Sequence, residues 1–299
     1  QADYQWRKAD GDVEAGTAKS KRFSGLVGID TSIGNSAIAG ATIGYVTNKV
    51  DGQRYLGNDR WALRGQLLYE GENVTNRLIA EHYETKEYNN FYPPAADPTT
   101  FVNGAARNGW ERKLRTAFGY EPSYDTRRNA DLDTQERITS RTDGISNQFD
   151  WRLGDNTLTS VTAWRRLYFR PKNDSDLSPF PIFRGGYDVD VDQYSQELRL
   201  SSPGGERFDY QAGVYLLRQE VTSNFRTQFL RDASAFFLSP AIPSVALNGL
   251  ETNQLGEAET TSGAVFGQGT WRFDDRASIT AGLRYTREQK DSTTLRYAT

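Results

Sequence analysis

Apolar and polar residues alternate over long stretches of this chain, most regularly near its C-terminal end. Between residues 277 and 286 every second residue is apolar: Ala277, Ile279, Ala281, Leu283 and Tyr285. Period two is typical of a strand with one apolar and one polar face. Residues 263–273 alternate more loosely, and Asp274-Asp275-Arg276 is a turn signal between the two segments. We therefore predict a hairpin over 263–288, with arms of about ten residues, the length that a tilted strand needs to cross a bilayer.

The same pattern recurs upstream and predicts further strand pairs. They are Phe23–Ile33 with Ala37–Asn48, Arg60–Glu70 with Asn73–Tyr83, 144–153 with Asn156–Phe169, and Val189–Ser202 with a strand that begins at Phe208. Three long stretches lack regular alternation and are predicted as loops: Glu84–Arg141, Pro171–Asp188 and Thr222–Glu259. Residues 1–22 are charged and without periodicity, so we interpret them as a linker or an entry segment.

The lengths of the connections indicate the architecture. Short turns are predicted at Gly34, Gly71, Gly154, Pro203 and Asp274, and they alternate with the long connections. This alternation brings all short turns to one end of the sheet and all long loops to the other, as in outer-membrane β-barrels. Aromatic residues near both ends, among them Trp151, Trp271, Trp61 and Tyr194, are typical of the two membrane interfaces. The alternative explanation is that strands favour aromatic residues in general.

Composition agrees with this interpretation. The chain has 299 residues, 25% of them charged, and a net charge of −3, so nothing predicts a nucleic-acid partner. It has no run of 18 apolar residues, which excludes a transmembrane helix but not a transmembrane β-barrel, because half of each barrel strand faces a polar lumen. The chain starts with Gln1 and contains no methionine, so we expect a processed chain or a part of a longer one.

Chemistry-bearing motifs are few. His82 is the only histidine and cysteine is absent, so we predict no enzyme, no catalytic residue and no cofactor. We expect His82 to be an interfacial strand residue. Asp188, Asp190 and Asp192 lie on alternate positions and form a weak candidate for a Ca²⁺ site, although the EF-hand spacing is absent. The alternative is a solvated, charged strand end above the lipid.

The predicted loops carry aromatic residues and arginines that suit a flat, anionic or catecholate-type ligand. They equally suit loops that pack on one another, and both interpretations stay open. The candidate ligand-binding residues are Tyr88, Phe91, Tyr92, Trp110, Arg112, Phe183, Arg184 and Tyr187.

Two segments resemble the barrel of TonB-dependent outer-membrane receptors. The first is Ala264-Val-Phe-Gly-Gln-Gly-Thr-Trp followed by Ile279-Thr-Ala-Gly-Leu-Arg-Tyr-Thr-Arg-Glu. The second is Tyr194-Ser-Gln-Glu-Leu-Arg-Leu-Ser-Ser-Pro-Gly-Gly, which runs into Phe208-Asp-Tyr-Gln-Ala-Gly-Val-Tyr. Weaker matches around Arg60–Glu70 and Leu158–Arg165 extend the resemblance to most of residues 23–290.

The resemblance implies a 22-stranded antiparallel up-and-down barrel in the Gram-negative outer membrane, with short periplasmic turns and long extracellular loops. About ten of those strands are expected here, over residues 23–299, with no recognisable plug domain or TonB box. The implied partners are outer-membrane lipid, the TonB complex acting through a plug, and a small ligand such as a ferric siderophore. Two alternatives remain: a passive porin, and a soluble extracellular glycan-binding β-protein whose apolar faces would pack against a second sheet.

Overall fold

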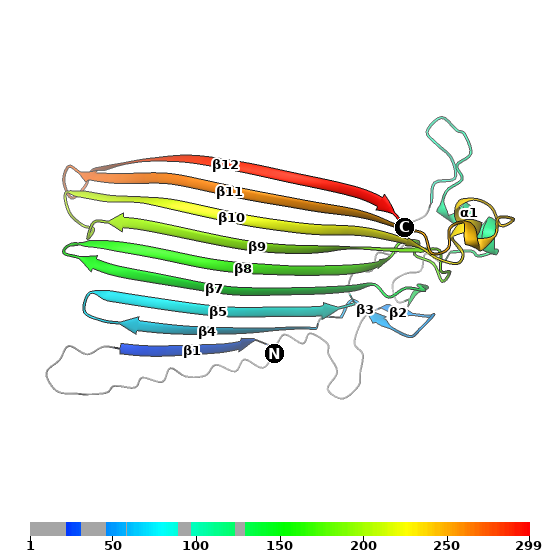
Figure 1. Cartoon of the computed structure of the whole chain (residues 1–299), viewed down its shortest axis with the longest axis horizontal. Coiled ribbons are helices and arrows are strands. Elements are labelled where there is room, and N and C mark those ends of the chain that lie inside the picture. The colour runs from blue at the N-terminus through cyan, green and yellow to red at the C-terminus, as the bar shows by residue number, and fades with distance from the viewer. Residues whose placement is uncertain (1–21, 31–45, 58, 89–96, 123–128) are drawn as a thin grey trace.

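The computed structural model describes residues 22–30, 46–57, 59–88, 97–122 and 129–299, with only the backbone for 22–30. Its main element is a nine-stranded antiparallel sheet whose strands lie side by side in chain order (Figure 1), close to the ten predicted. The strands are β1 (Arg22–Asp30), β4 (Arg60–Glu70), β5 (Val74–Glu87), β7 (Arg137–Leu153), β8 (Asn156–Asp174), β9 (Phe183–Ser201), β10 (Phe208–Phe229), β11 (Glu251–Arg272) and β12 (Ser278–Ala298).

Smaller elements lie in the connections between the long strands. A three-stranded sheet has the order β3-β2-β6, and two short α-helices and one 3₁₀ helix complete the described fold. Their bounds are β2 (Val46–Asn48), β3 (Arg54–Tyr55), β6 (Asn129–Ala130), α1 (Trp110–Phe118), α2 (Ala233–Phe237) and η1 (Ser244–Ala246). Among the described residues, no helix has the length and hydropathy needed to span a bilayer.

The tight turns have the residues that their geometry requires. Gly154, in the two-residue turn between β7 and β8, has φ 63°, a left-handed conformation that costs glycine little. Between β11 and β12, the Asp274 Oδ1 atom accepts hydrogen bonds from the backbone N–H groups of Arg276 and Ala277, both at 2.8 Å. An aspartate that bonds its own downstream backbone stabilises a reversal, so the predicted hairpin forms where the sequence placed it.

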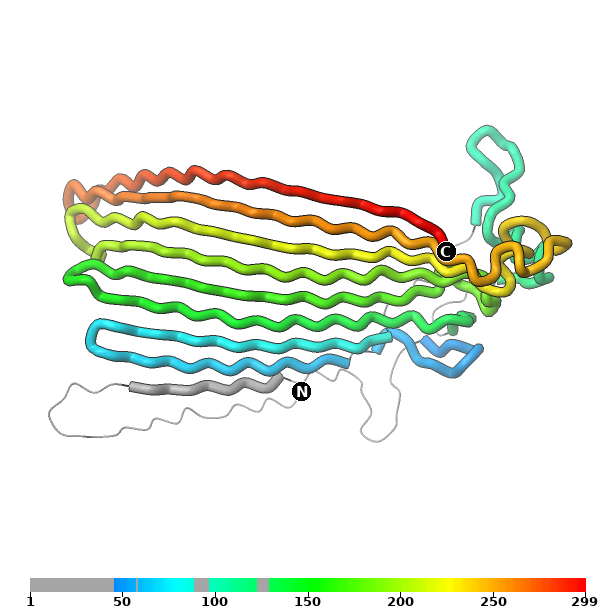
Figure 2. Tube along the Cα trace, viewed as in Figure 1, coloured from blue at the N-terminus to red at the C-terminus, as the bar shows by residue number. Residues whose placement is uncertain are grey.

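All the tight turns lie at one end of the sheet, the turn end (Figure 2). The described residues of the long connections, 97–122, 129–136, 175–182 and 230–250, lie at the other end, the loop end. This sorting was predicted from the alternation of short and long connections, and it leaves the long loops together on one side.

The loops are shorter than predicted, because the strands continue beyond the alternating residues. β5 ends at Glu87, β8 and β9 together leave only residues 175–182 between them, and β10 continues to Phe229. The predicted loop boundaries at Glu84, Pro171 and Thr222 were therefore wrong. Backbone hydrogen bonds do not depend on side-chain polarity, so the ladder continues where the side chains become charged on both faces.

The first predicted hairpin also differs. β1 pairs with β4 along its whole length, from Arg22 opposite Glu70 to Asp30 opposite Ala62. Of the predicted partner Ala37–Asn48, only β2 is described, and it pairs with β3 and β6 instead. The predicted turn at Gly34 lies outside the described residues.

Candidate functional site

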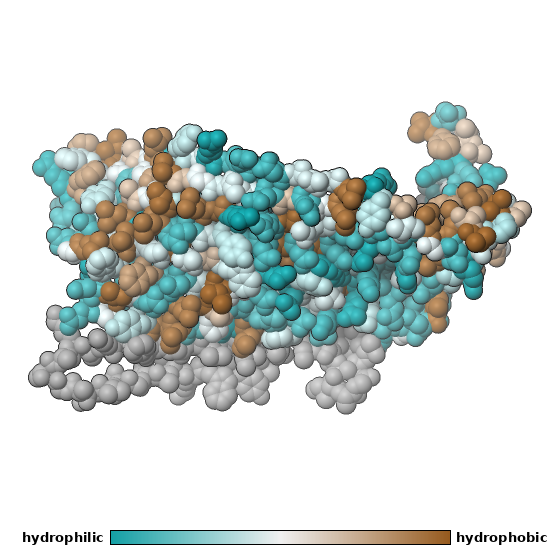
Figure 3. Space-filling view, viewed as in Figure 1, coloured by the Kyte–Doolittle hydropathy of each residue, from teal (hydrophilic) through white to brown (hydrophobic). Residues whose placement is uncertain are grey.

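The two faces of the large sheet differ in chemistry, since residues directly opposite each other on neighbouring strands share a face. Leu198, Val214 and Val265 are direct neighbours on one face, which we call the outward face. Glu197 and Arg284 lie on the opposite face, which we call the inward face. Figure 3 shows apolar residues gathered over the turn end of the sheet, mostly hydrophilic residues over its middle, and a further apolar group at the loop end. The outward apolar residues near the turns form a surface that we call the apolar band.

The apolar band is inclined to the rows of paired residues. The row that starts at Tyr285 on β12 continues through Val265, Val214 and Leu198 to Phe149, and it ends at Tyr69 on β4. Tyr285 is the last apolar outward residue before Arg287, at the upper edge of the band on β12. Tyr69 is next to the turn, at the lower edge on β4. One row therefore crosses the whole height of the band.

This crossing gives the tilt of the strands. The row spans seven strand spacings of about 4.8 Å, roughly 34 Å, while the band measures about 20–27 Å along a strand at about 3.4 Å per residue. A band that stays level with a membrane thus requires strands tilted by roughly 35° from its normal, within or near the range of about 35–45° in transmembrane barrels. The distribution of apolar residues is that of a tilted membrane wall.

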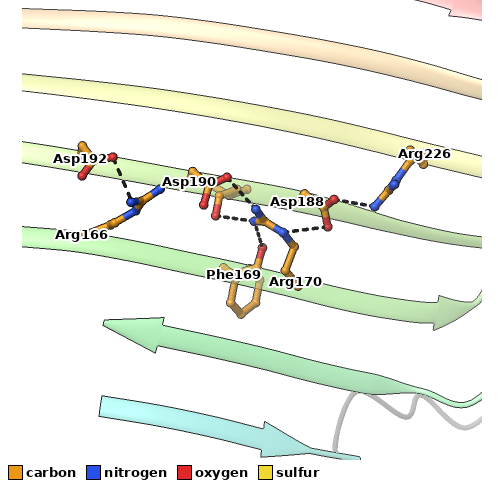
Figure 4. Close-up of polar contacts among 8 residues, drawn as sticks. Arg166, Phe169, Arg170, Asp188, Asp190, Asp192 and Arg226 are labelled. Carbon is orange, nitrogen blue, oxygen red and sulfur yellow. Dashed lines mark hydrogen bonds and ion pairs between the residues drawn. The ribbon is translucent and has the colours of Figure 1, made fainter. Parts of the chain in front are cut away.

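Above the band, the outward face becomes charged (Figure 4). Arg170 contacts Asp190 at 2.6 Å and Asp188 at 3.3 Å, and Arg226 contacts Asp188 at 2.5 Å. Asp192 lies 3.7 Å from Arg166. The three aspartates that alternate in the sequence thus each have an arginine partner on a neighbouring strand. A Ca²⁺ site at these three aspartates stays a prediction, because their contacts with the arginines do not test it.

His82 lies on the outward face at the upper edge of the band. Its ring packs against Trp61 with the centroids 4.4 Å apart, and its Nδ1 atom lies 2.5 Å from Asp143. On the inward face, Glu81 accepts from Arg64 at 2.6 Å and lies 3.1 Å from Arg165. These ion pairs compensate charges on the inward face.

The described residues of the long connections pack together at the loop end into a unit that we call the loop cap, residues 46–57, 97–122, 129–136, 175–182 and 230–250. Leu114 of α1, Ile182 and Phe236 of α2 form one buried cluster. A second cluster contains Val46, Tyr55, Ala130 and Leu132. Because each cluster draws on connections far apart in the sequence, burial of these side chains fixes the loops against one another.

The loop cap also encloses carboxylates. Asp133, Asp174 and Asp176 bring one oxygen each within 4.8 Å of one another, and this group could hold a divalent cation. Asp176 accepts from the backbone N–H of Phe183 at 2.9 Å. Burial raises the pKa of Asp176, and burial together with the neighbouring carboxylates raises that of Asp174. Burial raises the pKa of the nearby Glu136 to about 8.

Comparison with known proteins bears on this geometry directly. The sequence model of the family described as "TonB dependent receptor-like, beta-barrel" matches residues 76–299. The chain belongs to the TonB-dependent receptor β-barrel family. No curated protein matches the sequence. Members of this family are transporters of the Gram-negative outer membrane, not enzymes.

A solved structure shares the fold. The ferric yersiniabactin uptake receptor FyuA from Yersinia pestis superposes with a TM-score of 0.56 at 14% sequence identity. The match covers 98% of this chain and 40% of the FyuA chain. The described sheet is open, with β1 and β12 at its edges, and so forms part of a barrel wall. The soluble alternative required a second sheet over the apolar band, but in the described ranges the other sheet lies at the loop end instead.

The structure distributes the predicted ligand residues of this receptor wall over different environments. Trp110 and Phe183 pack on the cluster around Leu114, and Tyr88 packs on the cluster around Tyr55. Arg184 donates to Gln228 at 2.7 Å. Arg112 and Tyr187 are exposed, whereas Phe91 and Tyr92 lie outside the described residues.

The buried carboxylates of the loop cap were missed by the sequence analysis. Their side chains come from two connections about forty residues apart, which only the fold brings together. The available signal was the spacing Asp174-x-Asp176 in a Pro- and Asp-rich stretch, which we interpreted only as a loop.

Proposed function

We propose that this wall belongs to a receptor that takes up a scarce nutrient, most consistently an iron–siderophore complex, with energy from the TonB complex. The observation that carries the proposal is the loop cap itself: all described long connections lie at one end of a membrane wall and pack into an ordered surface with exposed aromatic and arginine residues. Loops of this kind provide a binding surface that varies without disturbing the hydrogen-bonded wall. Ferric yersiniabactin, which FyuA takes up, supports a ferric complex as the ligand class.

Uptake measurements test the proposal. Iron-limited cells that carry the receptor are given radioactive ferric complexes of a catecholate, a hydroxamate and a carboxylate siderophore, with and without a functional TonB complex. We expect TonB-dependent accumulation of at least one complex. Equal uptake without TonB would instead support the passive porin, and no uptake of any complex would contradict the siderophore assignment.

Variants locate the binding surface. Tyr187→Ala and Arg112→Ala remove exposed candidates at the loop end and are expected to weaken binding of the transported complex, by up to about 1 kcal/mol for an aromatic contact. Phe273→Ala is the matched control, because Phe273 is an exposed aromatic residue at the turn end. A larger loss of binding in Phe273→Ala than in the two loop variants would contradict the assignment of the ligand to the loop end.

Orientation is part of the same proposal: the loop cap faces the medium and the tight turns face the periplasm. Cysteines at Asn103 or Asn248, both exposed, are expected to react with an impermeant thiol reagent on intact cells. Cysteines at Asp155 or Asp275 are expected to react only after the outer membrane is opened. Labelling at the turn positions alone on intact cells would invert the orientation.

A further inference from the structure

One carboxylate on the inward face is shared by two arginines, a group that we call the arginine bridge. Glu81 on β5 accepts a hydrogen bond from Arg64 on β4 with its Oε2 atom, at 2.6 Å. Its Oε1 atom lies 3.1 Å from the Arg165 Nη2 atom on β8. Neither arginine has a second ion pair among the side chains that the structure describes. Two guanidiniums against one carboxylate leave the bridge with a surplus positive charge.

Gly144 allows the bridge to cross a strand. Glu81, Gly144 and Arg165 are direct neighbours in one row of paired residues, with the glycine on β7 in the middle. A Cβ atom at Gly144 would lie 3.1 Å from both the Cγ and the Oε1 atoms of Glu81. The missing side chain therefore leaves the space through which Glu81 reaches Arg165.

The arginines are accessible from the lumen. The side chains of Arg64 and Arg165 are 56% and 62% exposed, against 25% for Glu81. Arg165 lies inside the sheet, between the described strands β7 and β9, so its surplus charge does not result from an open sheet edge. A guanidinium has five N–H donors and binds a carboxylate best through two parallel hydrogen bonds. The bridge therefore has the donors for a second carboxylate.

Amide side chains continue the same row. Arg165 is opposite Gln193, which is opposite Gln219, and Gln219 donates to Gln193 at 3.3 Å. Glu81 directly precedes His82, which lies at the upper edge of the apolar band, so the row faces the lumen below the loop cap. A ligand that passes from the loop cap into the lumen meets the arginines and these amides.

We propose that the arginine bridge binds a carboxylate group of the transported ligand on its way through the lumen. The inference rests on the proposed uptake and narrows its ligand class: among ferric complexes, the bridge favours a carboxylate siderophore over an uncharged hydroxamate complex. Charge complementarity selects this ligand, because the surplus charge is positive and the planar guanidinium fork matches the geometry of a carboxylate.

Binding of citrate, a small tricarboxylate, to the purified full-length receptor tests the proposal by isothermal titration calorimetry. Glu81→Gln removes the competing carboxylate and is expected to raise the citrate affinity, by up to about fivefold for exposed charges. Arg165→Gln is expected to lower it by a similar factor, and Arg165→Lys, which keeps the charge without the planar fork, by less. Arg199→Gln is the matched control, because Arg199 on the same face has its own partner, Glu197, at 3.2 Å.

The opposite effects of Glu81→Gln and Arg165→Gln distinguish a ligand site from a structural cross-link. If the bridge only connects strands, both variants weaken the wall and neither raises the citrate affinity, which would overturn the proposal. Absence of citrate binding, or binding that Arg165→Gln leaves unchanged, would overturn it as well. The assay needs neither TonB nor uptake, so a receptor that binds citrate here but accumulates no ferric complex would contradict the proposed nutrient and not this site.

Discussion

The wall and the loop cap are stabilised by different partners. Nearly every buried apolar residue that the structure describes lies in the loop cap: Val46, Tyr55, Leu114, Ala130, Leu132, Ile182, Ala233 and Phe236, with Ala264 alone in the wall. Large apolar residues of the wall stay exposed, up to 82% for Leu283. The cap therefore has a core of its own, while the wall depends on the hydrogen-bonded ladder and on lipid for its apolar side chains. A substitution in the cap should therefore act through the buried core, and a substitution in the wall through the hydrogen-bonded ladder or the lipid contacts.

The largest effect is expected in the core of the loop cap. Leu114 is fully buried between Ile182 and Phe236, so Leu114→Ala should destabilise the cap by about 2–5 kcal/mol. Hydrogen exchange should show faster opening of α1 and of the connection 230–250, with the wall strands unchanged. Equal loosening of β9 and β10 would show that the cap and the wall are one cooperative unit.

A nearly equal effect is expected when charge enters the apolar band. Leu283→Arg should lower the stability of the membrane-inserted protein by about 2–4 kcal/mol if the residue lies near the midplane. Arg284→Leu, one residue further and on the inward face, should be milder, since it loses an exposed hydrogen bond to Thr286 at 3.1 Å and the contacts over Tyr215 and Phe266. Unfolding in lipid measures both, and the reverse order would show that the faces are wrongly assigned.

These two regions also explain what the sequence could predict. Alternation over 277–286 reports contact with lipid, so it predicted the faces of Leu283 and Arg284 and the tight turn at Asp274. It could not predict the ends of the strands, because above the band residues such as Arg170 and Asp190 are charged and carry no period-two signal. The cap clusters join Leu114 to Phe236 across more than a hundred residues, and no local pattern encodes that contact.

A smaller effect, confined to the cap, is expected from pH. Burial raises the pKa of Glu136 to about 8, so its protonated form favours the folded cap. Stability from this group is fully present below its ordinary pKa near 4.5 and is lost as the pH rises through about 8. The backbone N–H of Asp174 donates to Glu136 at 3.1 Å. Its protection against hydrogen exchange should fall more than about tenfold between pH 5 and 9, after correction for intrinsic exchange.

Glu136→Gln is the control for that pH dependence, because its amide does not ionise and retains an acceptor oxygen for the Asp174 amide. The variant should lose clearly less protection than the unmodified protein over the same interval, and the loss that remains belongs to Asp174 and Asp176, whose pKa values burial also raises. An equally steep loss in the variant would assign the titration to Asp174 or Asp176 instead.

The smallest effect is expected at the turn end of the wall. Asp274→Ala removes the acceptor of two backbone N–H groups and should destabilise the β11–β12 hairpin by about 1 kcal/mol. Asp275→Ala, in the same turn, is the matched control. Unfolding in lipid should distinguish the two, and an equal effect would mean that the Asp274 hydrogen bonds add nothing in the membrane.

The tilt of the wall is the central claim, and the depth of one row of residues tests it most directly. Spin labels at Tyr285, Val214, Leu198, Phe149 and Tyr69 share a single row of paired residues. Their accessibility to oxygen and to a water-soluble nickel complex gives the depth of each label in the bilayer. Labels at Tyr285 and Tyr69 should lie near opposite interfaces, with Leu198 deepest and Val214 and Phe149 at similar intermediate depths. Equal depth along the row, or exposure of every label to the nickel complex, would contradict the membrane wall described here.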